Sequence, residues 1–79
     1  MTSKTLAREL QRLEGERTIP LSRYEEDGFE SRAEYLADVA DEYGLSLETV
    51  VTLAALLGGD EDFDGLIGMA EDAEHVGDL

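Results

Sequence analysis

The chain has 79 residues, no cysteine, 20 acidic and six basic residues, and a formal net charge of −14. A chain this short forms one small domain (residues 1–79), and without cysteine neither disulfides nor thiolate zinc sites brace it. The charge disfavours direct binding to nucleic acid or to anionic membranes, because affinity for phosphates depends on Lys and Arg. The charge is also uneven. All six basic residues precede residue 33, whereas residues 33–79 hold 13 of the 20 acidic ones.

The first predicted element is an amphipathic helix over residues 3–14. Leu6, Leu10 and Leu13 recur at helical spacing and define its apolar face. A second stripe on this helix is basic, and we expect it to face solvent or to dock on the protein's own carboxylates. This stripe consists of Lys4, Arg8 and Arg12.

The helical pattern breaks between residues 15 and 30. A residue that precedes proline avoids the helical region of backbone space, so Ile19-Pro20 predicts a short extended segment within residues 17–24. The run Glu25–Gly28 is predicted to be a turn, because Asp and Gly favour turns.

A capping box begins the second predicted helix. The side chain of Ser31 is placed to accept from the amide of Glu34, whose own side chain reaches back to the start of the helix. Gly44 is placed to end this helix in the left-handed conformation.

Two more predicted helices complete an all-α bundle of about four short helices. Ser46 caps a helix over about residues 47–57, and the last helix lies within residues 62–76. Residues 36–55 also fit a helix-turn-helix pattern. Their second helix carries no base with which to read DNA, so the pattern indicates packing of two helices and not DNA binding.

Residues 60–71 fit the calcium-loop pattern of an EF-hand, and Gly65 stands where that loop turns sharply. Gly58-Gly59 stands where the entering helix of a hand is expected, and no second hand is present. The other interpretation is an acidic helix start, where carboxylates complement the helix dipole. The ligands under the calcium alternative would be Asp60, Asp62, Asp64, the carbonyl of Leu66, and Glu71.

The five residues from Ser46 to Val50 resemble the opening of the second helix of acyl carrier proteins. That resemblance implies a phosphopantetheine attached to Ser46, although Leu45 stands where the family has aspartate. Helix capping is the other interpretation of Ser46. His75 is the single histidine, and no Walker-type loop is present. We therefore predict a protein that is not an enzyme and that needs no cofactor.

Carboxylates are predicted to gather on one face of the second helix and in the C-terminal region. Successive carboxylates on that helix face lie about 5–6 Å apart and present charge somewhat as a phosphate strand does. Such a face would be attracted to a basic nucleic-acid-binding surface of another protein. The candidate partner-binding residues are Glu34, Asp38, Asp41, Glu42, Asp60, Glu61, Asp62, Asp64, Glu71, Asp72 and Glu74.

The stretch EYLADVADEYGLSLETVVTLAALLGGDEDFDGL is similar to short proteins of phages and mobile elements. As a small, acidic, cysteine-free helical chain, the protein is also similar in kind to phage-encoded DNA mimics, the anti-CRISPR and anti-restriction proteins. This resemblance implies an inhibitor of a CRISPR or restriction complex, acting in the host cytoplasm. A lesser alternative is a halophilic protein of unrelated function, although halophilic adaptation should spread acidity over the whole surface.

Overall fold

A computed structural model describes residues 3–77, and within that range the chain forms five α-helices, one short 3₁₀-helix and no strand. The predicted all-α class is therefore confirmed. The elements are α1 (Ser3–Gly15), α2 (Leu21–Glu26), α3 (Arg32–Glu42), α4 (Leu47–Leu57), η1 (Gly59–Glu61) and α5 (Gly65–Gly77). None of the described helices is both long enough and apolar enough to cross a membrane.

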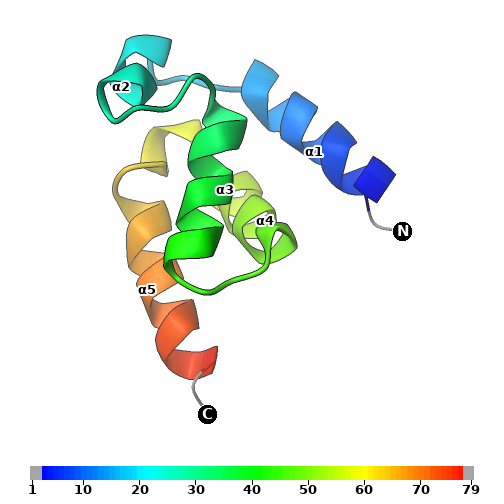
Figure 1. The fold of residues 1–79 in the computed structure, drawn as a ribbon, viewed down its shortest axis with the longest axis vertical. Helices are drawn as coiled ribbons and strands as arrows, with labels where there is room; N and C mark the ends of the chain where they lie inside the picture. Colours follow the sequence, from blue (N-terminus) through cyan, green and yellow to red (C-terminus); the bar gives the residue numbers. More distant parts are fainter. Residues whose placement is uncertain (1–2, 78–79) are drawn as a thin grey trace.

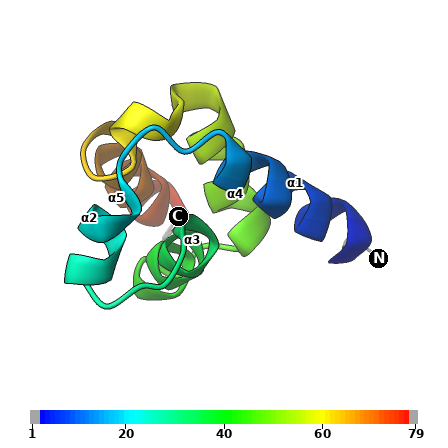
Figure 2. The ribbon, with the colours of Figure 1, turned by 90° about the horizontal axis from the view of Figure 1, so that it is seen from above.

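The helices α3, α4 and α5 form the body of the molecule, and α1 and α2 lie at its upper edge (Figure 1). Seen from above, α1 extends away from α2 and α5 and lies against α4 (Figure 2). The closest helix packing is between α3 and α4, as the helix-turn-helix pattern predicts. The core residues are Leu13, Tyr24, Tyr35, Leu36, Val39, Ala40, Val50, Val51, Ala54, Leu66 and Ala70.

Helix α2 is the main difference from the predicted elements. Residues 16–20 are non-helical, and Pro20 has extended backbone angles (φ −57°, ψ 144°). Residues 21–26 are helical, where the sequence predicted the end of an extended segment and the start of a turn. Burial explains the difference, because Tyr24 inserts fully into the core and this tertiary packing overrides weak local preferences.

The predicted starts of α3 and α4 are confirmed by their caps. The Ser31 hydroxyl accepts from the amide of Glu34 at 3.1 Å, and the Ser46 hydroxyl accepts from the amide of Thr49 at 3.1 Å. The Glu34 carboxylate accepts from the amide of Glu30 at 3.0 Å, one residue earlier than a standard capping box requires. Gly44 follows α3 with a φ of 66°, the left-handed conformation that favours glycine.

Candidate partner-binding surface

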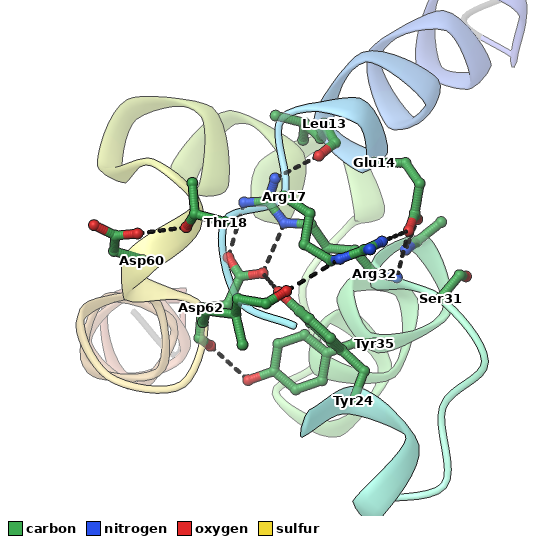
Figure 3. A network of polar contacts seen from close by, with 12 residues as sticks. Leu13, Glu14, Arg17, Thr18, Tyr24, Ser31, Arg32, Tyr35, Asp60 and Asp62 are labelled. Atoms are coloured by element: carbon green, nitrogen blue, oxygen red, sulfur yellow. Dashed lines mark hydrogen bonds and ion pairs between the residues drawn. The ribbon is translucent and has the colours of Figure 1, made fainter. Parts of the chain in front are cut away.

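A buried ion pair between Arg32 and Asp62 fixes the segment that carries many of the candidate acidic residues (Figure 3). Both side chains have zero exposure. The Arg32 Nε donates to Asp62 Oδ2 at 2.7 Å and Nη2 donates to Oδ1 at 2.8 Å, so the pair is bidentate. The remaining nitrogen, Nη1, donates to the carbonyl of Leu13 at 2.7 Å. Each of the three guanidinium nitrogens therefore has a hydrogen-bond acceptor within the protein.

Two tyrosines complete this cluster. The Tyr24 hydroxyl donates to Asp62 Oδ2 and the Tyr35 hydroxyl donates to the Asp62 carbonyl, each at 2.6 Å. Burial raises the pKa of both tyrosines, and the Asp62 carboxylate raises each pKa further by disfavouring a second negative charge nearby. The cluster joins the end of α1, helices α2 and α3, and the segment before α5 (Figure 3).

The burial of Asp62 corrects its assignment as a partner-binding residue, since a carboxylate with zero exposure cannot contact another molecule. Helical spacing signals the burial of Arg32 but not that of Asp62. Arg32 lies three and four residues before the buried Tyr35 and Leu36 of the same helix, whereas Asp62 lies in the turn between η1 and α5, outside either helix. The two partners are 30 positions apart, so no local motif pairs them.

The carboxylates of Asp60, Glu61 and Asp62 serve the fold and do not converge as calcium ligands. Asp60 accepts from the hydroxyl of Thr18, and Glu61 accepts from the amide of Gly65 at 3.1 Å, where it caps α5. Helix α5 begins at Gly65, where a calcium loop requires a sharp turn. In the part of the chain that the structure describes, no three His, Cys, Asp or Glu side chains are grouped to hold a metal ion.

The remaining predicted carboxylates are exposed on α3, on α5 and just before α5. They lie away from the buried faces of both helices, and for α3 this is the face that the helical periodicity predicts. Asp64, directly before α5, is exposed as well. We call the exposed carboxylates of the two helices the acidic surface, which comprises Glu34, Asp38, Asp41 and Glu42 of α3 with Glu71, Asp72 and Glu74 of α5.

Carboxylates from both halves of the acidic surface influence Tyr43, which follows α3. Helices α3 and α5 pack against each other and run side by side in the same direction (Figure 1). Partial burial raises the pKa of the Tyr43 hydroxyl, and the negative charges of Glu71, Glu42 and Glu74 raise it further. Carboxylates from both helices therefore act on the same hydroxyl.

Arginines do not neutralise this surface within the described residues. The basic stripe of α1 was expected to face solvent or to dock on the protein's own carboxylates. Among its described side chains, Arg12 pairs with Glu9 of the same helix and with Glu16 in the turn that follows it. The side chains of Lys4 and His75 lie outside what the structure describes. The ion pairs are Arg12 with Glu9 and Glu16, Arg17 with Glu14, Arg23 with Asp27, and Arg32 with Asp62.

Comparison with known proteins finds no matching family model, no matching curated protein and no matching solved structure. The geometry and charge of the acidic surface are therefore the observations from which a function can be inferred. The hydroxyl of Ser46, the candidate attachment site in the resemblance to acyl carrier proteins, accepts from the amide of Thr49 and caps α4.

Proposed function

We propose that this chain is a non-enzymatic inhibitor or regulator that binds the basic nucleic-acid-binding surface of a partner protein through its acidic surface. The observation that carries the proposal is the position of seven exposed carboxylates on two adjacent helices, where none of the described arginines pairs with them. Carboxylates that have no arginine partner attract a basic protein over a long range, and this attraction is strongest at low salt.

The layout of the charges supports mimicry of a phosphate backbone more than a diffuse acidity. Along α3, Asp38 follows Glu34 by one turn and Glu42 follows Asp38 by another, so neighbouring carboxylates are about 5–6 Å apart. Helix α5, which packs against α3, adds a second set of carboxylates, and members of both sets raise the pKa of the Tyr43 hydroxyl. A partner that grips two phosphate strands with Arg and Lys side chains would find complementary charge in these two sets.

The position of Arg32 supports the same proposal. Arg32, the one base in α3, is buried and fully paired with Asp62. It therefore contributes no exposed positive charge to the acidic surface. On the strength of this arrangement and of the resemblance to phage DNA mimics, the partner class we propose is a CRISPR surveillance complex or a restriction enzyme whose DNA-entry surface becomes occupied.

The test is displacement of a fluorescent DNA duplex from purified complexes of these two kinds. The chain should displace the duplex at low ionic strength and lose potency as salt rises, because exposed charges are screened over about 10 Å at 0.1 M salt. Absence of displacement from every complex at low salt would count against mimicry. Equal displacement by polyglutamate of the same total charge would show that charge alone, and not its layout, is responsible.

A matched pair of variants locates the contact. Asp38→Asn with Asp41→Asn removes two charges from the acidic surface, and Glu25→Gln with Glu26→Gln removes two exposed charges from α2. We expect the first variant to lose about tenfold in potency, since interfacial charge pairs are worth on the order of 1 kcal/mol or more. The second should change potency by less than about twofold, as rim charges act mainly through weak steering.

A further inference from the structure

A groove between α1 and α4 forms a second surface that lies apart from the acidic one. The two helices contact each other and are seen side by side from above (Figure 2). The groove encloses about 330 Å³ and continues into a shallow hollow of about 260 Å³ over the first half of α4, with Glu48 and Thr52 shared by both. The residues that line the larger part are Thr5, Leu6, Glu9, Glu48, Val51 and Thr52.

The apolar stripe of α1 extends beyond the core that covers it. Leu13, near the end of α1, is 1% exposed, whereas Leu10 and Leu6 are only half-buried and Leu6 lines the groove. On α4, Leu56 lies one turn beyond Thr52 and is 75% exposed. The two helices thus offer apolar side chains to a third element that packs between or along them.

The negative charge at the rim of the groove favours a partner that carries basic side chains. Carboxylates stand on both helices at the rim of the groove, and none of the described residues that line it is basic. Glu9 pairs with Arg12, whereas none of the ion pairs among the described residues engages Glu48. A second copy of the chain is disfavoured, because two molecules of net charge −14 repel each other.

We propose that the α1–α4 groove binds an amphipathic helix of a partner protein, with leucine-like side chains on one face and Lys or Arg on its flanks. The apolar face of that helix would cover Leu6 and Leu56, and a flanking base would pair with Glu48. This is the helix-in-groove mode of peptide recognition. The groove is made by α1 and α4, so it does not depend on the acidic surface of α3 and α5.

The probe is a synthetic leucine–lysine peptide of about 14 residues, ordered so that the leucines form one helical face. It is titrated into the isotope-labelled chain at about 0.15 M salt, where diffuse electrostatic attraction is screened, and backbone NMR shifts are followed. We expect the shifts to map to residues 5–9 and 48–56. A peptide of the same composition without an apolar face should bind at least about tenfold more weakly.

Single substitutions test the groove itself. Thr52→Arg places bulk and a like charge against the probe and should weaken binding about tenfold, while Glu48→Gln should weaken it roughly two- to fivefold. Leu56→Ser should weaken binding about fivefold through lost apolar contact. The matched controls are Met69→Ser, which removes an exposed apolar side chain of α5, and Glu25→Gln, which removes a charge of α2; neither should change binding by more than about twofold.

Three outcomes would overturn the proposal. Shifts confined to α3 and α5 would mean that the acidic surface holds the peptide by charge alone. Equal binding of the two peptides would show that no apolar face is recognised. Sedimentation that reveals a dimer, with the groove residues shifting on dilution, would assign the groove to a second copy of the chain. Each outcome is separate from the DNA-displacement test, because the variants used there lie on α2 and α3.

Discussion

The substitution Asp62→Asn tests whether the buried ion pair holds the fold together. The change is nearly isosteric, so it creates no cavity, but it leaves the Arg32 guanidinium buried with no opposing charge. Two donors of Arg32 and the hydroxyl of Tyr24 all donate to this carboxylate. Replacing it by a neutral amide removes the negative charge that these three donors bind. Removing one partner of a buried pair costs about 3–5 kcal/mol.

That loss is large for a chain of this size. At roughly 0.05–0.15 kcal/mol per residue, a 79-residue domain has a free energy of unfolding of about 4–12 kcal/mol. A loss of about 3–5 kcal/mol therefore removes between a quarter of that stability and all of it, and lowers the Tm by roughly 12–40 °C. The assay is urea denaturation followed by far-ultraviolet circular dichroism, with thermal melting in parallel.

Two comparisons make the measurement decisive. Asp60→Asn changes an exposed carboxylate that is bonded only to Thr18, and it should cost less than about 1 kcal/mol. Arg32→Met combined with Asp62→Leu should be more stable than Asp62→Leu alone, because no unpaired charge then remains buried. Equal stability of Asp62→Asn and Asp60→Asn would refute the view that this pair is buried and structurally required.

The remaining predictions concern alkaline pH and two glycines. The pKa values of Tyr24 and Tyr35 are raised in the folded state, so their contribution to stability is present below pH about 10 and is lost as pH rises above that value. The urea midpoint should fall steadily above pH about 10, and less steeply in Tyr24→Phe; an unchanged slope would contradict this. Gly59→Ala should cost about 1–3 kcal/mol, since its Cβ would lie 3.1 Å from the amide nitrogen and the hydroxyl of Thr18. Gly68→Ala, with open space around it in α5, should instead stabilise the chain by up to about 1 kcal/mol in the same urea titration.

Local sequence signals predicted most of the fold because they act over three or four residues. Ser31 and Ser46 mark the starts of α3 and α4 within one residue, and Gly44 marks the turn between them. Helix α2 was missed because it has only six residues, and the burial of Tyr24 in a distant core holds it in place.

The acidic surface could be predicted in outline, but its exact membership could not. Periodicity placed the carboxylates of α3 on one exposed face, and they are exposed in the structure, as are Glu71, Asp72 and Glu74 of α5. Asp62 looked like its neighbours in an acidic run, and only a contact with Arg32, 30 positions away, reveals its structural role. The packing of α3 against α5, which brings their carboxylates onto one side of the chain, is likewise tertiary, and a local pattern does not specify it.

The most direct test of the acidic-surface proposal is amide hydrogen exchange of the chain bound to a complex from which it displaces duplex DNA. Slower exchange should concentrate in the exposed turns of α3 and α5, around Asp38, Tyr43 and Glu71, relative to the free chain. Protection confined to α1 and α4, with α3 and α5 exchanging as in the free chain, would contradict the proposal.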